Sequence, residues 1–393
     1  MLVLASEKTS KRNGFMSKIA VVIPKYGLAG GAEQFASELT GKLRDRTQDD
    51  FHVLANRWTP DPGAVRLEKI PIVSFPKWMT TVSFAWFVQN QIRRGNFDLV
   101  HSHERIFAAD LFTLHGVPHR YWVDEVRRKS MSLYDRATAW VERKLVLEGG
   151  CRKFVAVSSL TRDIFLREYA IDPDRVAVIH PGVELSGYRR KNKNEARRAV
   201  RSSLGIGESD PVIVFASMNF EIKGLDDIIT SLGRLQKQAE SLKLVVAGKG
   251  NVKKYQKMAG EAGVAENIVF TGVLDREKLT DLYLAGDLYV MLSKFDTFGM
   301  VVLEAMAAGL PVMVSSRVGA KDVVAQGENG FVVENPSDHD HVASVLKMML
   351  DEGNRRRMST AALATASENS WDAAAEKYRT LYEEILAAKK KEA

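Results

Sequence analysis

Two carboxylates, Asp296 and Glu304, stand at either end of one short segment and are separated by seven residues. An apolar run at 288–292 predicts a strand before them, and the turn that holds Asp296 and Gly299 opens a helix ending at Gly309. A helix N-terminus at the carboxyl end of a parallel strand offers free N–H groups and a positive dipole end, which favour a diphosphate. Carboxylates beside it accept hydrogen bonds from sugar and ribose hydroxyls. The segment therefore predicts a site for a nucleotide joined to a sugar.

Lys223 and His115 are further candidates for the same chemistry. Lys223 precedes Gly224 at the start of a predicted helix, where a cation opposes the helix dipole, so its position favours a functional role. That role would be to neutralise charge on a departing nucleoside diphosphate. His115 closes a predicted strand at 111–114 and is able to bind a sugar hydroxyl, or to stabilise positive charge at an anomeric carbon through its carbonyl. A purely structural histidine is the alternative.

Glycines in two loops offer backbone groups to a ligand. The run at 27–33 follows the first predicted strand, and its Gly30 and Gly31 let N–H groups approach a phosphate without interference from a Cβ. The spacing is not that of a dinucleotide fingerprint or a Walker loop, and a tight turn would explain it equally well. Val273 follows the end of another predicted strand, and the sequence alone does not indicate a function for this position.

Patterns that could bind a metal are incomplete. His101 and His103 point to the same side of a strand, but no third ligand has suitable spacing. Two Asp-x-Asp patterns, at 172–174 and 338–340, do not follow buried strands and are typical of a turn and of a helix cap. We therefore predict no metal.

The bulk composition is that of a globular protein. Its 393 residues are 45% hydrophobic and 27% charged, which suits two domains. No apolar run reaches the roughly 18 residues that span a bilayer. The single cysteine, Cys151, excludes an intramolecular disulfide and fits a reducing cytosol. A net charge of +7 favours an anionic partner: nucleic acid, acidic lipid or a phosphorylated glycan.

Strands and helices alternate from end to end, which predicts an α/β protein built from doubly wound sheets. We expect a disordered leader at 1–16, Rossmann-like domains at 17–185 and 205–368, a basic linker at 186–204, and a final helix and basic tail at 369–393. Two such sheets in tandem face each other across a cleft, and ligands bind at the carboxyl ends of the strands. The predicted strands lie at 19–24, 51–55, 70–74, 98–102, 111–115, 154–158 and 176–180, and then at 211–215, 244–247, 268–270, 288–292, 312–314 and 330–333.

The segment 119–147 combines aromatic and basic residues. On a helix, its apolar residues Leu133, Ala137, Trp140, Val141 and Leu147 share one face. Such a helix could lie on an anionic bilayer with its aromatic rings at the headgroup level. Alternatively, it packs on the first sheet and leaves its charges in solvent. Nucleic-acid binding is disfavoured because no recognisable module accompanies the charge.

The two-acid segment resembles the donor-site signature of retaining GT-B glycosyltransferases of the family 4 type. The match covers most of the chain and looks closest to the lipopolysaccharide-core glucosyltransferases of Gram-negative bacteria. The family usually has Glu at the first position, so Asp296 departs from it by one methylene. The Lys223–Gly224 pair matches the family, but the Arg expected five or six residues earlier is replaced by Ser217 and Met218. Asn219 and Lys249 are the candidates to replace that Arg.

The resemblance implies an enzyme that moves a hexose from a nucleotide sugar to a lipid-linked saccharide such as the lipopolysaccharide inner core. The implied hexose is glucose and the implied donor is UDP-glucose. Transfer would need no metal ion and would retain the configuration at the anomeric carbon. It implies an acceptor on the first domain, a donor on the second, and a last helix that crosses back to the first domain. The enzyme would work in the cytoplasm, peripherally on the inner membrane. The implied catalytic residues are His115, Lys223, Asp296 and Glu304, and the implied donor-binding residues are Gly30, Gly31, Lys223, Val273, Phe298, Gly299, Met300, Val301 and Glu304.

Two alternatives stay open. A binding protein could keep the nucleotide-sugar cleft without turnover, and the missing Arg and Asp296 are its only support. A UDP-sugar 2-epimerase uses the same fold and would release UDP without an acceptor.

Overall fold

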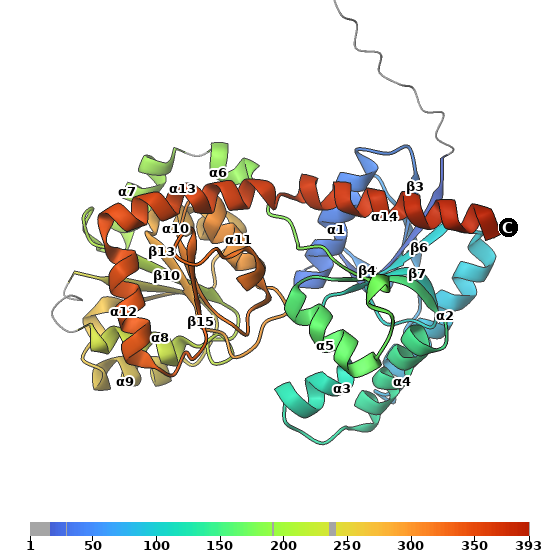
Figure 1. The fold of residues 1–393 in the computed structure, drawn as a ribbon, viewed down its shortest axis with the longest axis horizontal. Helices are drawn as coiled ribbons and strands as arrows, with labels where there is room; N and C mark the ends of the chain where they lie inside the picture. The colour runs from blue at the N-terminus through green and yellow to red at the C-terminus, as the bar shows by residue number, and fades with distance from the viewer. Residues whose placement is uncertain (1–15, 29, 191, 236–240, 393) are drawn as a thin grey trace, which may run out of the picture.

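A computed structural model describes residues 16–28, 30–190, 192–235 and 241–392 of the chain. Two parallel sheets form two domains that lie side by side, and helices flank each sheet (Figure 1). The doubly wound two-domain architecture expected from the alternating pattern is confirmed. Almost all of the leader predicted at 1–16 lies outside the described residues.

The N-terminal sheet has seven parallel strands in the order β5-β3-β1-β6-β7-β8-β9. Its central strands are buried on both faces, as expected for near-continuous apolar runs in a parallel sheet. The strands are β1 (Lys18–Val22), β3 (Asp50–Ala55), β5 (Arg66–Lys69), β6 (Leu99–Ser102), β7 (Ala109–Leu114), β8 (Cys151–Ala156) and β9 (Val176–Val178). Two short strands, β2 (Lys25–Tyr26) and β4 (Arg57–Trp58), pair beside it. The helices and helical turns are α1 (Gly31–Arg44), α2 (Met79–Gly95), α3 (His119–Tyr121), η1 (Trp122–Val126), α4 (Leu133–Leu147), α5 (Ser159–Tyr169) and η2 (Pro173–Arg175).

The C-terminal sheet has six parallel strands in the order β12-β11-β10-β13-β14-β15, which is the Rossmann order. The strands are β10 (Val212–Ser217), β11 (Lys243–Gly248), β12 (Ile268–Gly272), β13 (Leu288–Met291), β14 (Val312–Ser315) and β15 (Gly330–Val333). The helices and turns of this half are α6 (Ser186–Arg190), α7 (Lys193–Ser203), α8 (Leu225–Arg234), α9 (Val252–Glu261), η4 (Ala265–Asn267), α10 (Arg276–Ala285), α11 (Met300–Ala307), η5 (Gly319–Val323), α12 (His339–Leu350) and α13 (Glu352–Glu368). The strand order reverses between β10 and β13, so a crevice opens at their carboxyl ends.

The prediction of a strand at 70–74 is wrong. The strand is β5, which ends at Lys69 opposite Ala55. The N–H of Ile70 still donates to the carbonyl of Ala55 at 2.8 Å, but Pro71 has no N–H with which to continue the ladder. The apolar residues beyond it leave the sheet.

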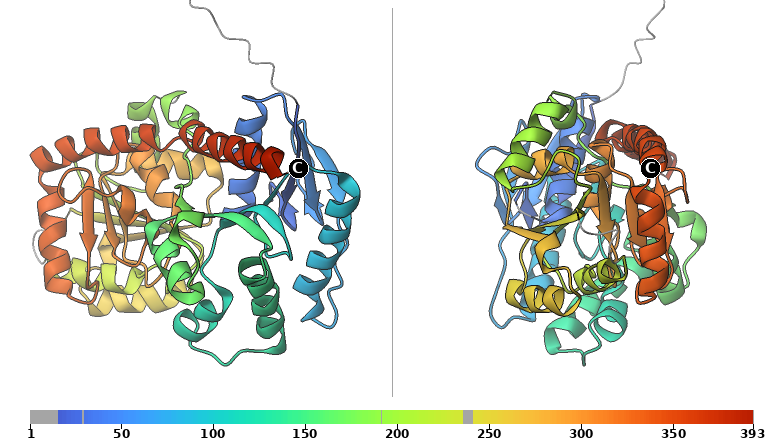
Figure 2. Two further views of the ribbon diagram at one scale, coloured as in Figure 1. Left: turned by 45° about the vertical axis from the view of Figure 1, so that its right-hand side comes forward. Right: turned by 90° about the vertical axis from the view of Figure 1, so that its left-hand side faces the viewer.

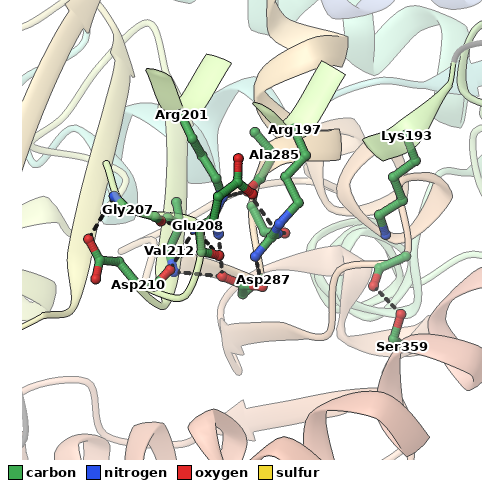
Figure 3. Close-up of polar contacts among 12 residues, drawn as sticks. Lys193, Arg197, Arg201, Gly207, Glu208, Asp210, Val212, Ala285, Asp287 and Ser359 are labelled. Carbon is green, nitrogen blue, oxygen red and sulfur yellow. Dashed lines mark hydrogen bonds and ion pairs between the residues drawn. The ribbon is translucent and has the colours of Figure 1, made fainter. Parts of the chain in front are cut away.

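The basic run expected as a linker is largely helical and is docked on the C-terminal domain (Figure 3). Lys193, Arg197 and Arg201 recur every four residues and so lie on one face of α7. Arg197 and Arg201 bind the carboxylate of Asp287 at 3.1 and 2.7 Å, and Arg201 is only 1% exposed. Lys193 donates to the carbonyl of Ala308 at 3.1 Å. The run therefore holds a helix to this domain as well as connecting the two.

The last helix, α14 (Trp371–Glu392), returns to the N-terminal domain and lies along it in both Figures 1 and 2. The Tyr378 hydroxyl lies 3.0 Å from the Thr113 hydroxyl, and the Tyr382 hydroxyl lies 2.8 Å from His101 Nδ1. The resemblance to GT-B glycosyltransferases implies this return of the last helix to the first domain. None of the helices in the described ranges combines the length and the apolar content needed to cross a membrane.

Candidate active site

Lys223 and Asp296 form an ion pair at the switch point of the C-terminal sheet. Lys223 lies in the loop after β10 and Asp296 in the loop after β13, and these strands are neighbours, so parallel pairing brings the two loops together. Both side chains line a cavity of about 550 Å³, together with His115 from the N-terminal domain. The three residues predicted from distant parts of the sequence therefore share one cavity. We call it the first cavity.

Two glycines shape the loops that carry this pair. Gly224 caps α8 with a φ of 74°, and a Cβ there would lie 2.1 Å from the carbonyl oxygen of Leu292. Gly299 caps α11 with a φ of 91°, and a Cβ there would lie 2.7 Å from Cε of Met291. Both positions need glycine, because the left-handed conformation and the close approach each disfavour a side chain. The loops are thereby held tight against the strand ends.

His115 supplies the N-terminal wall of the first cavity. Its carbonyl accepts a hydrogen bond from the Thr297 hydroxyl at 3.0 Å, and its Nε2 lies 2.8 Å from Nδ1 of His103. Burial lowers the pKa of His115 to about 3. The imidazole is therefore neutral at physiological pH and acts as a hydrogen-bonding group.

The N-terminal domain holds the loop before α11 from the other side. Ser158 Oγ donates to the carbonyl of Thr297 at 2.6 Å. The N–H of Ser159 donates to the carboxylate of Asp322 at 2.6 Å, and His180 Nε2 lies 3.2 Å from the same carboxylate. Burial raises the pKa of Asp322, but the hydrogen bonds from His180 and Ser159 outweigh it, so the pKa is lowered. We call these contacts the interdomain clasp, and they fix the loop of Asp296 relative to both domains.

Glu304 lies in a second cavity, of about 480 Å³, on the other side of the same loop. Burial raises the pKa of its carboxyl, although the nearby Arg276 guanidinium and Tyr283 hydroxyl lower it in part. The Tyr283 hydroxyl is buried next to this carboxyl. A buried carboxyl group and a buried hydroxyl in one cavity are suited to a ligand rich in hydroxyl groups.

The start of α11 joins the two cavities. Asp296 and Thr297 line the first cavity, whereas Met300 and Val301 line the second. The first turn of a helix has N–H groups without partners inside the helix and carries the positive end of its dipole. The arrangement places a helix N-terminus, which favours an anion, between two cavities lined by polar groups.

The comparisons with known proteins agree with this geometry. The model of Glycosyltransferase Family 4 matches residues 29–186, and the model of Glycosyl transferases group 1 matches residues 196–365. A D-inositol 3-phosphate glycosyltransferase of Corynebacterium efficiens is 30% identical to the chain over 93% of each protein. The chain belongs to the GT-B glycosyltransferases. Another D-inositol 3-phosphate glycosyltransferase, from Streptomyces bingchenggensis, is 28% identical over 75% of this chain and 68% of its own.

Solved structures share the fold of this glycosyltransferase. WaaG, a glycosyltransferase involved in lipopolysaccharide biosynthesis, has a TM-score of 0.76 and 23% identity, over 93% of this chain and 99% of its own. Anabaena Alr3699/HepE in complex with UDP-glucose has a TM-score of 0.72 and 18% identity, over 95% of this chain and 100% of its own. The fold, the family and the enzyme class expected from the sequence are confirmed.

The other predicted donor residues of the glycosyltransferase lie at varying distances from the two cavities. Gly30 caps α1 and Gly31 begins it, and Gln34 and Glu38 of the same helix line the second cavity. Val273 is 61% exposed and lines neither cavity. The Phe298 ring is buried and stacks on His180, while its N–H donates to Asp296 at 3.3 Å. Phe298 thus helps to orient the Asp296 carboxylate through its backbone and lines neither cavity itself.

Of the two candidates to replace the missing Arg, Asn219 lines the first cavity, whereas Lys249 is exposed and lines neither cavity.

Several other residues that line the two cavities of this glycosyltransferase were not predicted from the sequence. The missed residues are Arg105, His119 and Trp122 in the first cavity and Tyr188, Arg276 and Tyr283 in the second. The sequence could have indicated two of them, because Arg105 and Arg276 follow soon after the predicted strands at 98–102 and 268–270.

The patterns considered for a metal have other roles in the glycosyltransferase. His101 binds Thr113 and Tyr382, and Asp172 and Asp338 cap helical segments. Within the described ranges, no group of three His, Cys, Asp or Glu residues is placed to hold a metal ion.

Proposed function

We propose that this glycosyltransferase moves a glucosyl group from UDP-glucose to a lipid-linked saccharide such as the lipopolysaccharide inner core, with retention and without a metal ion. The observation that carries the proposal is a spatial order. The first cavity, the N-terminus of α11 and the second cavity follow one another along the loop and first turns of this helix. A sugar, a diphosphate and a nucleoside need these three environments in that order.

The donor would be bound mainly by the C-terminal domain. Glu304 would accept hydrogen bonds from the ribose hydroxyls, and Asp296 from hydroxyls of the glucose. Backbone N–H groups of Gly299, Met300 and Val301 would hold the diphosphate. Lys223 would neutralise the charge that builds on the leaving group, a task for which preorganised cations are effective.

Transfer would proceed on one face of the sugar. The bond from the anomeric carbon to the phosphate oxygen breaks, and the bond to the acceptor oxygen forms on the same side. The leaving phosphate oxygen takes the acceptor's proton, so no separate base is required. The neutral His115 would position a sugar hydroxyl, and its carbonyl faces the loop of Asp296. The interdomain clasp would help to exclude water from this step.

The acceptor would enter from the N-terminal side of the first cavity. That side is lined by polar and aromatic groups typical of saccharide sites, among them Glu104, Arg105, His119 and Tyr134. Similarity to D-inositol 3-phosphate glycosyltransferases favours a second candidate acceptor, a free inositol phosphate.

A membrane contact through 119–147 is also part of the proposal. Val141 of α4 is fully buried, as expected if the helix packs on the first domain. Leu133, Trp140 and Leu147 of the same helix are instead 69%, 46% and 44% exposed. Basic residues flank this exposed face, which therefore suits the headgroup layer of an anionic bilayer. The enzyme would act at the cytoplasmic face of the inner membrane.

The test is a nucleotide-release assay over a panel of sugar nucleotides, with and without extracted lipopolysaccharide core, in buffer containing EDTA. We expect UDP release from UDP-glucose only with the acceptor, and a product with the donor's anomeric configuration. Binding without release would indicate a binding protein, and release from UDP-GlcNAc without acceptor would indicate an epimerase. Transfer to D-inositol 3-phosphate alone would favour the second candidate acceptor.

A further inference from the structure

One large cavity of the structure is not part of the active site. It has a volume of about 840 Å³ and lies between α2 and α4, which pack against each other in the N-terminal domain (Figure 1). We call it the α2–α4 groove. Its lining is mainly apolar and aromatic: Val73, Met79, Val82, Trp86, Phe87, Phe107, Ala108 and Trp140. A cavity of this size is within the range of small-molecule sites.

The mouth of the α2–α4 groove is marked by two exposed indoles. Trp86 is 54% exposed and Trp140 is 46% exposed. Trp140 packs edge-on against Phe107, with ring centroids 5.6 Å apart. Indole rings favour the boundary between hydrocarbon and water, where one edge of the ring stays wet. The groove thus has an apolar interior and an interfacial rim.

Cations flank the same rim. Arg93 and Lys144 line the groove, and Lys144 lies 5.0 Å from the Trp140 ring centroid. Glu148 also lines it and lies 3.4 Å from Lys144, so it offsets part of this charge. Arg94, next to Arg93, is exposed. The rim therefore keeps a net positive charge, which complements an anionic headgroup above an apolar chain.

One polar group inside the groove lacks a partner. Gln89 lines the groove, and its Oε1 is buried without a hydrogen bond in the part of the chain that the structure describes. A buried acceptor without a partner is unfavourable, and a hydroxyl of an occupant would satisfy it. Glycerol-based headgroups carry such hydroxyls.

The groove shares a wall with the active site. Thr81 of α2 and Thr138 of α4 lie 3.1 Å apart through their hydroxyls, and both line the first cavity. The same two helices bound the groove on their other side. An occupant of the groove would therefore sit one helix layer from the sugar end of the cleft.

We propose that the α2–α4 groove binds one acyl chain of an anionic phospholipid from the membrane, with the headgroup at Arg93 and Lys144. The groove then anchors the enzyme so that the first cavity opens towards the bilayer surface. This inference builds on the proposed membrane contact but specifies a stoichiometric lipid site, independent of donor and acceptor.

The test is calorimetric titration of the full chain with dioctanoyl-phosphatidylglycerol kept monomeric, without any sugar nucleotide. We expect saturable binding of one lipid per chain. Trp86→Asp, which changes an exposed side chain at the mouth, should weaken binding at least tenfold. Leu363→Asp, at a side chain of similar exposure (45%) on α13, is the matched control and should bind normally. Val82→Trp, which fills the interior, should abolish binding while UDP binding persists.

Other variants separate this site from general adhesion to membranes. Leu133→Asp changes an exposed residue of α4 outside the groove, so it should weaken binding to phosphatidylglycerol vesicles but leave binding of the monomeric lipid unchanged. Absence of saturable binding by the wild type, or equal binding by Trp86→Asp and Leu363→Asp, would overturn the proposal. So would a concentration-dependent dimer that Trp86→Asp dissociates, since the groove would then be an interface between copies.

Discussion

The ion pair between Lys223 and Asp296 gives each charge a partner in the first cavity. In the proposed complex, a diphosphate at the start of α11 would share the lysine, and the side chain would already be near the position where negative charge develops. Such preorganisation is what makes a cation effective in catalysis, because little reorganisation is needed during the reaction.

Lys223→Ala should lower kcat by about 10²- to 10³-fold, the range seen when one preorganised electrostatic group is removed. The melting temperature should fall as well, because the side chains of Lys223 and Asp296 are only 21% and 17% exposed and the variant leaves Asp296 without its partner. Lys294→Ala is the matched control, because Lys294 pairs with Asp226 at 3.0 Å in the same region but lines neither cavity. Steady-state kinetics and thermal unfolding of both variants check the prediction. Equal kcat values for the two would contradict it.

Glu304→Gln should be less active and yet more stable at neutral pH. The folded-state pKa of Glu304 is raised, so its contribution to stability is present below the unfolded pKa and is lost as pH rises through the folded pKa. The gain in stability from Gln should therefore be larger at pH 8 than at pH 4. Transfer should fall at least about tenfold, because a hydrogen bond to a charged group contributes about 1.5–3 kcal/mol. Unfolding curves at both pH values test the first part, and a variant less stable than the wild type at pH 8 would refute it.

Among the residues of the site, Lys223, Asp296 and His115 could be predicted from the sequence. Each of them follows a strand that can be predicted from the apolar residues just before it. The sequence could not reveal Tyr188 or Tyr283. These residues reach the site only because α6 packs on α10 and α10 packs on α11, and that packing depends on contacts between distant parts of the chain.

Among the elements, β6 and β7 carry a buried row of histidines beneath α14. Burial lowers the pKa of His101 and of His115 to about 3, and that of His103 to well below its usual value. Tyr382 of α14 hydrogen-bonds to His101, and the Phe35 ring of α1 packs on His103 and His115. The strand pair and these two helices therefore enclose imidazoles whose neutral form is favoured.

The free energy of unfolding should consequently fall as the pH drops from about 6.5 towards 5. Unfolded histidines bind protons in this window, but the buried ones do not until about pH 3, so each contributes a slope of up to about 1.4 kcal/mol per pH unit. Urea unfolding at several pH values measures the slope. His101→Gln removes one titrating group and should reduce the slope by about one such increment. A stability that stays constant over this window would contradict the explanation.

The elements themselves were largely predictable because apolar runs mark the strands, as at 330–333. Two details have local causes. Pro71 ends the edge ladder of β5 earlier than the apolar pattern indicates. The basic run at 186–204 interrupts the apolar pattern, which predicts a linker, but the sequence does not show that Arg201 is buried on Asp287 and on backbone carbonyls.

For the whole molecule, the interdomain clasp and the crossing of α13 to α14 fix how the two domains face each other. The loop of Asp296 receives hydrogen bonds from the N-terminal domain at Thr297, while Asp322 binds Ser159 and His180. No single stretch of sequence contains this arrangement, since each partner is more than 130 residues from the other. The relative position of the domains is therefore a property that only the folded chain shows.

Asp322→Asn should weaken the interdomain clasp and admit water to the first cavity. The ratio of UDP-glucose hydrolysis to transfer should rise several-fold, because closed domains exclude competing water. Asp340→Asn is the control, as that carboxylate is 83% exposed on α12. Product analysis with limiting acceptor measures the ratio for both. An unchanged ratio in Asp322→Asn would show that the clasp has no part in excluding water.

The central claim is that one nucleotide sugar spans both cavities across the start of α11. A crystal structure of the enzyme with UDP-glucose tests it most directly. The account predicts ribose hydroxyls on the Glu304 carboxylate, the diphosphate on the N–H groups of Gly299 to Val301 beside Lys223, and glucose hydroxyls on Asp296. A nucleotide bound elsewhere, with Glu304 and Lys223 both out of contact, would contradict it.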